Sequence, residues 1–173
     1  MLLKRLEHWD HISFCRLFSR SSSKHFSYAY WLSKTADGPL YLLLVACLLA
    51  FNAAEAASFS KLLLAGFAVE LPLYLLLKNS IRRARPGQVL TTFVQAYITP
   101  SDRFSLPSGH TAGAFVIVAA VATCYPLWLP LVLLWAGGIG LSRIVLGVHF
   151  PLDVCAGAVL GTASTMVALF LLS

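Results

Sequence analysis

Five apolar stretches follow one another along the chain, each bounded by polar residues or by glycine and proline. Runs of this composition are typical of α-helices that cross a lipid bilayer. The pattern therefore predicts membrane spans at about residues 39–57, 62–77, 110–124, 126–141 and 151–172. Tyr125-Pro126 leaves almost no connection between the third and fourth spans, so we expect those two helices to be antiparallel neighbours.

Residues 1–36 contain no comparable apolar run. Their large apolar side chains instead recur on one face at helical spacing, with charged residues between them: Leu2, Leu3, Leu6, Trp9 and Leu17. This spacing is typical of an amphipathic helix that lies in the membrane surface. We therefore predict two regions, an interfacial amphipathic segment over residues 1–36 and a membrane-embedded domain over residues 37–173.

Glycine residues lie in the last two spans at positions that favour close helix packing. Gly157 and Gly161 are one helical turn apart in the fifth span, and Gly137, Gly138 and Gly140 lie near the end of the fourth. Because these residues have no side chain, two membrane helices can approach each other closely there.

Glu70 is the only charged residue of the second predicted span. An ionisable group is costly in lipid, so we expect this side chain to face water or the interior of the bundle. We interpret it as a protonated or hydrogen-bonded packing residue, the alternative being a contact to a proton or a lipid headgroup.

The composition agrees with a membrane protein. Hydrophobic residues make up 58% of the chain and charged residues 12%, and the mean hydropathy of +0.78 is too high for a soluble domain of this size. We predict an all-α integral membrane bundle of about five transmembrane helices with an N-terminal interfacial helix. The net charge is +6, but the basic residues do not interleave with aromatic ones. We therefore expect no nucleic acid as partner, and instead phosphate or anionic lipid headgroups.

Reactive side chains gather in residues 142–153, a segment that is otherwise apolar. Arg143 supplies a planar fork suited to a phosphate or carboxylate. Pro151 is suited to the first position of a helix, which places Asp153 in the first turn and His149 just outside it. A carboxylate there can hold one ring nitrogen of His149 and leave the other free as a base or nucleophile. Taken alone, the segment also fits an interfacial loop with an incidental ion pair.

Two further polar segments lie next to the second and third spans. If the second helix continues, Lys78, Arg82 and Arg85 fall on one face and favour an anion there, although a basic cluster against lipid headgroups is an alternative. Ser108 and Gly109 begin the third span, where a hydroxyl, backbone N–H groups and the helix dipole favour an anion. The long loop between these segments, residues 87–106, suggests a lid or a substrate groove.

All three polar segments lie at the ends of predicted spans. Because consecutive spans alternate in direction, these ends lie on the same side of the membrane. We therefore expect the three segments to form one site that is rich in phosphate-binding groups.

In order, the segments are Lys-x6-Arg-Pro, Pro-Ser-Gly-His and Ser-Arg-x5-His-x3-Asp, within residues 78–153. This arrangement resembles the type-2 phosphatidic acid phosphatase superfamily, which shares its site with vanadium haloperoxidases and bacterial acid phosphatases. Every motif position carries the residue type that the resemblance requires.

The resemblance implies a role for each motif residue. His149 resembles the nucleophile that forms a phosphohistidine, Asp153 the residue that orients and activates it, and His110 the acid that protonates the leaving oxygen. The phosphate-binding set is implied in the same way: Lys78, Arg85, Ser108, Gly109 and Arg143. Arg82 and Arg83 are not fixed positions of the motif and stay outside this set.

We therefore expect a hydrolase that acts on a phosphate monoester or diphosphate of a membrane lipid. The resemblance suggests phosphatidylglycerophosphate, phosphatidic acid, undecaprenyl diphosphate or lipid A phosphates as substrates. One alternative is a phosphotransferase that passes the phosphoryl group to a second lipid. Another is a non-enzymatic protein that binds or moves lipids, which would be expected to lose His149 or Asp153, yet both are present.

Neither a metal nor another cofactor is expected. The chain has seven acidic residues, and they are spread along the sequence. They do not cluster as the ligands of a two-metal phosphatase do.

Two arguments about membrane orientation disagree. With five spans, every Lys and Arg except Lys61 lies on the side of the site, and the positive-inside rule then places the site in the cytoplasm. The bacterial proteins that the chain resembles generally have sites that face the periplasm. Lys78, Arg85 and Arg143 are committed to phosphate and so say little about orientation. We therefore follow the resemblance, which implies an inner-membrane protein whose site faces the periplasm.

Overall fold

The computed structural model describes residues 2–51, 54–100 and 102–173, and the side chains from Lys4 onward within them. In this part of the chain all regular structure is helical. The helices are α1 (Leu2–Ser19), α2 (Ser23–Lys34), α3 (Gly38–Ala50), α4 (Ala56–Ile81), α5 (Pro86–Val89), α6 (Gly109–Cys124), the 3-10 helix η1 (Pro126–Trp128), α7 (Leu129–Val145) and α8 (Pro151–Leu172).

The predicted spans correspond to α3, α4, α6, α7 and α8, which confirms the all-helical membrane bundle. Among the described residues, three helical segments are long and apolar enough to cross a membrane: Ala56–Val89, Pro126–Val145 and Pro151–Leu172. Helices α2 and α3 together qualify as a fourth span, bent by 52°. Helix α6 is apolar but has only 16 residues. Residues 52 and 53, which the prediction includes in the first span, lie outside the described residues.

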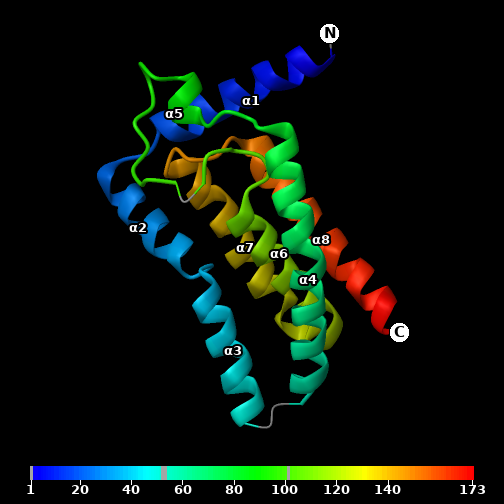
Figure 1. The fold of residues 1–173 in the computed structure, drawn as a ribbon. Helices are drawn as coiled ribbons and strands as arrows, with labels where there is room; N and C mark the ends of the chain where they lie inside the picture. Colours follow the sequence, from blue (N-terminus) through cyan, green and yellow to red (C-terminus); the bar gives the residue numbers. More distant parts are fainter. Residues whose placement is uncertain (1, 52–53, 101) are drawn as a thin grey trace.

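Helix α6 is the centre of the bundle and packs against α4, α7 and α8 (Figure 1). Ten of its residues are buried, from Thr111 to Val121. The C-terminal half of α6 packs with α4 through a cluster that includes Phe59, Leu62 and Val116. Glu70 is 5% exposed on α4, so it faces the interior of the bundle as predicted.

Glycine residues bring α8 against its neighbours. A Cβ atom on Gly157 would lie 2.5 Å from the carbonyl oxygen of Ser108, and one on Gly161 would overlap the carbonyl oxygen of Ala112. On α7, a Cβ atom on Gly140 would lie 2.6 Å from Cγ1 of Val154. These contacts confirm the predicted close packing and hold the start of α6 beside the start of α8.

The prediction is wrong for one glycine of the fourth span. No atom lies within 4 Å of the position that a Cβ of Gly137 would take, so this residue makes no close helix contact. Gly138 does approach another helix, since its Cβ would lie 3.0 Å from Cδ2 of Leu32 on α2.

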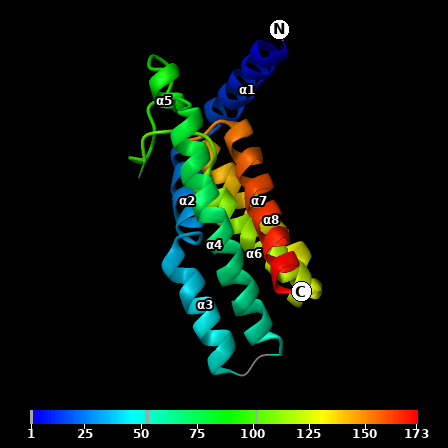
Figure 2. The same cartoon turned by 45° about the vertical axis from the view of Figure 1, so that its right-hand side comes forward.

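Helix α1 lies at one end of the bundle and contacts α7 and α8 (Figures 1 and 2). It packs there through Asp10 and Phe14, which are 4% and 0% exposed. Leu6, Trp9 and Leu17, from the predicted apolar face, are exposed. The side chains of residues 2 and 3 lie outside the described part of the structure. The helix therefore has one face on the bundle and an apolar face left free, and its place in the membrane surface stays a prediction.

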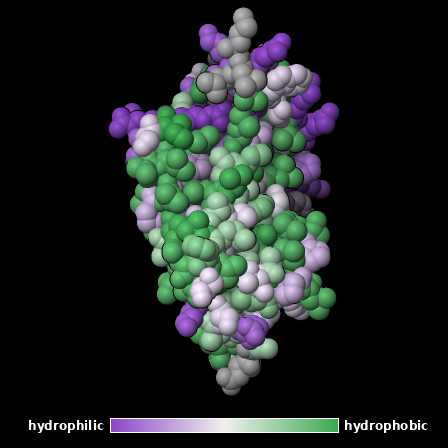
Figure 3. Space-filling model, turned by 90° about the vertical axis from the view of Figure 1, so that its right-hand side faces the viewer, coloured by the Kyte–Doolittle hydropathy of each residue, from purple (hydrophilic) through white to green (hydrophobic). Residues whose placement is uncertain are grey.

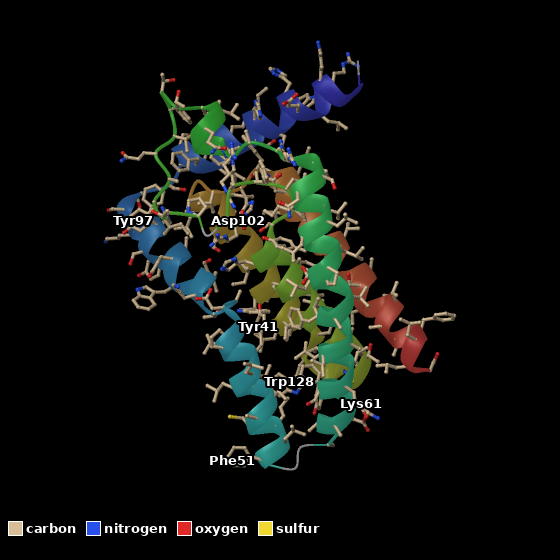
Figure 4. All side chains as sticks on the ribbon, viewed as in Figure 1. Tyr41, Phe51, Lys61, Tyr97, Asp102 and Trp128 are labelled. Carbon is tan, nitrogen blue, oxygen red and sulfur yellow. The ribbon has the colours of Figure 1, made fainter. Side chains whose placement is uncertain are left out.

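On the face shown in Figure 3, most polar residues lie at the end of the bundle that carries α1, a few lie toward the other end, and apolar side chains cover most of the middle. Phe51 and Lys61 lie at the opposite end, where α3 ends and α4 begins (Figure 4). Asp102 lies at the polar end (Figure 4). The fold thus places the ends of α4 and α7 and the starts of α6 and α8 together.

Candidate active site

The three sequence motifs converge at the polar end of the bundle. Lys78 belongs to the last turn of α4, and Arg85 precedes α5. The second motif begins α6, and the third joins the end of α7 to the start of α8. Six of the predicted site residues are at most 5% exposed: Lys78, Arg85, Ser108, Arg143, His149 and Asp153. Burying so many charges is costly unless they have partners, and most of them do.

His149 lies in the short connection between α7 and α8, with its two ring nitrogens in different surroundings. Nδ1 lies 3.7 Å from Oδ2 of Asp153, which is longer than a hydrogen bond, and it has no hydrogen-bond partner among the described residues. Nε2 lies 3.5 Å from Nη1 of Arg85. Burial lowers the pKa of His149 to about 4, so the ring is neutral near pH 7. A neutral ring with one nitrogen toward a cation is suited to attack an anionic substrate bound there.

Asp153 is held by three donors. Its Oδ2 accepts hydrogen bonds from the backbone N–H of Phe150, at 2.7 Å, and from the hydroxyl of Ser105. Its Oδ1 accepts a hydrogen bond from Nη1 of Arg83 at 2.6 Å. These bonds fix the plane of the carboxylate and leave Oδ2 as the oxygen that faces His149.

The side chains of Lys78 and Arg85 converge on one carboxylate, that of Asp102. Oδ2 of Asp102 lies 2.8 Å from Nζ of Lys78, and Oδ1 lies 2.5 Å from Nη2 of Arg85. Tyr74 donates a further hydrogen bond to Oδ2 at 2.9 Å. Partial burial would raise the pKa of Asp102, but the hydrogen bonds and charges of Lys78 and Arg85 outweigh it and hold that pKa below its ordinary value. The two cations thus already bind an anionic group.

Ser108 and Gly109 begin α6 beside the same cations. The Ser108 hydroxyl accepts a hydrogen bond from Thr111 at 3.0 Å, so its own proton is left to donate to a ligand. Its backbone N–H donates to the carbonyl oxygen of Asp153 at 3.0 Å, which joins α6 to α8. A Cβ atom on residue 109 would lie 3.0 Å from the ring of Tyr74, so a larger residue here would fit only if that ring moved.

His110 and Arg143 face a common cavity of about 330 Å³. Nε2 of His110 lies 3.2 Å from Oδ1 of Asp37, and Arg143 donates through Nη1 to Ser33 at 2.6 Å. Nε of Arg143 has no hydrogen-bond partner within the described part of the chain. The other residues that line the cavity are mostly polar: Tyr30, Ser33, Lys34, Asp37, Ile98 and Thr99. The second histidine and the third cation therefore border a space that can hold a polar group.

The structure corrects the predicted basic face. Helix α4 ends at Ile81, and Arg82 has a left-handed backbone with φ of 52° and an exposed side chain. Arg82 therefore does not share a face with Lys78 and Arg85. Arg83, outside the predicted set, is the residue that bonds to Asp153. The motif itself carries no signal for this, because the turn after α4 decides which arginine points inward.

Within the described residues, carboxylates and histidines do not cluster as metal ligands do. Across residues 2–51, 54–100 and 102–173, no group of three or more His, Cys, Asp or Glu side chains is arranged to hold a metal ion. The positive charge of the site comes from lysine and arginine, and metal independence stays a prediction.

The chain shares its family and fold with known membrane phosphatases. Residues 59–172 match the sequence model of the PAP2 superfamily. A lipid A 1-phosphatase of Rhizobium johnstonii is 35% identical over 89 residues, which are 50% of this chain and 36% of that protein. The chain spans between about a third and a half of the length of the curated relatives it matches.

Two solved structures are similar in fold. Aquifex aeolicus LpxE has a TM-score of 0.78 and 26% identity over 91% of this chain and 92% of the other. A transmembrane PAP2-type phosphatidylglycerolphosphate phosphatase from Bacillus subtilis has a TM-score of 0.74 and 21% identity, over 96% of this chain and 86% of the other.

Proposed function

The chain belongs to the PAP2 superfamily, and we propose that it removes phosphate from a phosphate monoester or diphosphate of a membrane lipid, with His149 as the nucleophile. The observation that supports this most directly is the setting of His149. Its ring is buried, with Nε2 3.5 Å from Arg85 and Nδ1 on the side of Asp153. Such a ring can attack at one nitrogen while a carboxylate stabilises the charge that develops at the other.

In the first step, Nε2 of His149 attacks the phosphorus atom. A nitrogen–phosphorus bond forms, and the bond from phosphorus to the lipid oxygen breaks. The ring becomes positively charged, and its Nδ1–H then points to Oδ2 of Asp153. The present separation of 3.7 Å shortens to a hydrogen bond as that charge develops, since catalytic hydrogen bonds are often long without a ligand.

Three cations and one hydroxyl stabilise the phosphoryl oxygens in this mechanism. Lys78 and Arg85 already converge on the carboxylate of Asp102, so a phosphoryl group competes with that carboxylate for both of them. Arg143 and the free proton of the Ser108 hydroxyl complete the set. Charge stabilisation by groups already in place supplies much of the rate enhancement in phosphoryl transfer.

His110 acts on the leaving side. It borders the polar cavity, and the leaving oxygen of the lipid takes a proton from it as the ester bond breaks. The same ring then accepts a proton from the water whose oxygen attacks phosphorus; the nitrogen–phosphorus bond breaks, inorganic phosphate is released and His149 returns to its neutral form. Asp37, 3.2 Å from Nε2, holds the ring through this exchange.

The membrane fold and the relatives support a lipid as the substrate class. A site at the ends of membrane helices is reached from the bilayer, and the Rhizobium johnstonii relative is a lipid A 1-phosphatase. We place the protein in the inner membrane with the site facing the periplasm. Lysine and arginine supply the positive charge, so the reaction needs no divalent metal or other cofactor.

The test is phosphate release from purified protein in detergent with excess chelator. The panel contains phosphatidic acid, phosphatidylglycerophosphate, undecaprenyl diphosphate, lipid A and a soluble aryl phosphate. We expect release from at least one lipid and little from the soluble ester. Addition of an unphosphorylated acceptor lipid separates hydrolysis from phosphotransfer. No release from any lipid, or release only after magnesium is restored, would contradict the proposal.

A further inference from the structure

Asp10 is a buried carboxylate on α1, outside the three motifs and outside the residues that match the PAP2 superfamily. Its side chain is 1% exposed, and it makes two specific contacts. Oδ2 lies 2.5 Å from Nη2 of Arg83, and Oδ1 accepts a hydrogen bond from the backbone N–H of Leu152 at 2.9 Å. Both partners lead directly to the segment that carries His149 and Asp153.

The first path runs through Arg83. Its guanidinium bridges two buried carboxylates, with Nη2 on Asp10 and Nη1 on Asp153 at 2.6 Å. It also lies over the ring of Phe150, 4.6 Å from the centroid. A planar fork held at both ends cannot rotate, so Asp10 fixes the nitrogen that Arg83 offers to Asp153.

The second path runs through the start of α8. This helix begins at Pro151, and the backbone N–H of Leu152 is one of the donors that a helix start leaves without an internal partner. Asp10 accepts from it and therefore caps α8 from another helix. The same turn carries Asp153, so the cap holds the backbone of the residue that faces His149. His11 and Phe14 of α1 also pack on the ring of Phe150 in this turn.

Resting on the function proposed above, we propose that Asp10 is a positioning residue of the phosphatase site, which acts through Arg83 and the start of α8 to set the carboxylate of Asp153 against His149. The charge of Asp10 has a second effect. Because Arg83 is shared between two carboxylates, it neutralises Asp153 less than it would if Asp153 were its only partner. Asp153 therefore keeps more negative charge to stabilise the cationic ring of the phosphohistidine.

The test is steady-state kinetics of Asp10→Asn on the fastest lipid of the panel. The amide keeps the size of the side chain and an acceptor for Leu152 but loses the charge that holds Arg83. We expect kcat to fall about 10–100-fold, by analogy with the loss seen when residues that orient the ligands of a metal site are changed. KM should stay within about threefold, because the groups proposed to bind phosphate are untouched. Glu7→Gln is the matched control, since it removes the same charge from an exposed position of the same helix and should retain full activity.

A double-mutant cycle shows whether Asp10 acts through Arg83. In an Arg83→Gln background, Asp10→Asn should lower kcat by about threefold or less, because the shared path is already lost. An equal loss in both backgrounds would overturn the relay. A kcat for Asp10→Asn within about twofold of wild type, or a loss seen only in KM, would overturn the positioning role itself.

If Asp10→Asn folds poorly, Arg83→Lys tests the same proposal. Arg83→Lys keeps the charge but cannot bridge both carboxylates with one fork, so it should also lose kcat at constant KM. A wild-type kcat for Arg83→Lys would then overturn the proposal.

Wild-type protein and His149→Ala are run in parallel. An inactive wild type refutes the phosphatase function, whereas an active wild type with an inactive His149→Ala and a normal Asp10→Asn refutes this inference alone.

Discussion

Nη2 of Arg85 lies 2.5 Å from Oδ1 of Asp102, and this pair places an acidic side chain at the cations proposed to bind phosphate. Lys78 bonds to the other oxygen of the same carboxylate at 2.8 Å. The carboxylate and a bound phosphoryl group are therefore competitors. If the proposed phosphate site is right, Asp102 has to give up these cations when a substrate binds, and a lid or groove formed by the segment that follows α5 stays a prediction.

This competition predicts the effect of Asp102→Asn on inhibition by vanadate. Vanadate mimics the five-coordinate phosphorus of the transition state. Removal of the competing charge should strengthen vanadate binding about tenfold, a change in free energy close to that of one hydrogen bond to a charged group. Inhibition constants of the variant and of wild type provide the measurement, with Glu55→Gln at the opposite end as control. Weaker vanadate binding in the variant would mean that Asp102 positions the cations instead of competing for them.

The surroundings of His149 predict how it titrates. Burial lowers the pKa of His149 from 6.5 to about 4, so its signals in nitrogen-resolved spectra of histidine-labelled protein should not shift between pH 8 and pH 5. His149→Gln identifies the signals. The neutral ring favours the folded state above pH 6.5, and this contribution is lost as the pH falls from 6.5 toward 4, because the unfolded chain takes up the proton first. A titration midpoint near 6.5 would contradict the buried, neutral ring.

The glycine contact between α6 and α8 predicts a loss of stability. In Gly161→Ala the new methyl group meets the carbonyl oxygen of Ala112, so the two helices have to separate. We expect a loss of about 1–3 kcal/mol in the free energy of unfolding, the usual effect of overpacking. Activity should fall as well, because these helices carry Ser108 and Asp153.

Gly137→Ala is the matched control for that measurement. Its methyl group meets no atom within 4 Å, and alanine is favoured over glycine inside a helix. Thermal unfolding in detergent should give equal or higher stability for this variant. If both variants lost the same stability, the loss would not come from the contact with Ala112.

Orientation in the membrane gives a prediction that separates the charge rule from the family resemblance. Single cysteines at exposed positions Gln95 and Ser58 report the two ends of the bundle, after the native cysteines are replaced: Cys15, Cys47, Cys124 and Cys155. In spheroplasts, a thiol reagent that cannot cross membranes should label position 95 and not position 58. Labelling of position 58 alone would mean that the site faces the cytoplasm, as the positive-inside rule implies.

The sequence predicts the parts of this molecule that depend on local pattern. Apolar runs give the spans, and their alternation brings Lys78, Ser108 and His149 to one end. Gly157 and Gly161 indicate a close helix contact from their spacing alone. The contact partner, α6, becomes known only from the structure.

The parts that the sequence does not predict depend on contacts between distant residues. Arg83 rather than Arg82 faces Asp153 because α4 ends at Ile81 and the chain reverses through a left-handed residue. Asp10 is separated from Arg83 by 73 residues, and no local pattern relates the two. Asp102 likewise lies in a loop of mixed polarity, where its carboxylate has no sequence signature of a site residue.

A labelled phosphoenzyme is the most direct test of the central claim, that His149 is the nucleophile. The purified protein is mixed with a lipid that carries a radioactive phosphoryl group and is quenched in alkali, because phosphohistidine is labile in acid. We expect label on the wild-type protein that survives alkali and is lost in acid, and none on His149→Ala, whose turnover should fall by several orders of magnitude. Asp153→Asn should retain slow labelling, since its nucleophile is intact. Undiminished label on His149→Ala would show that another residue is the nucleophile and would contradict the proposed mechanism.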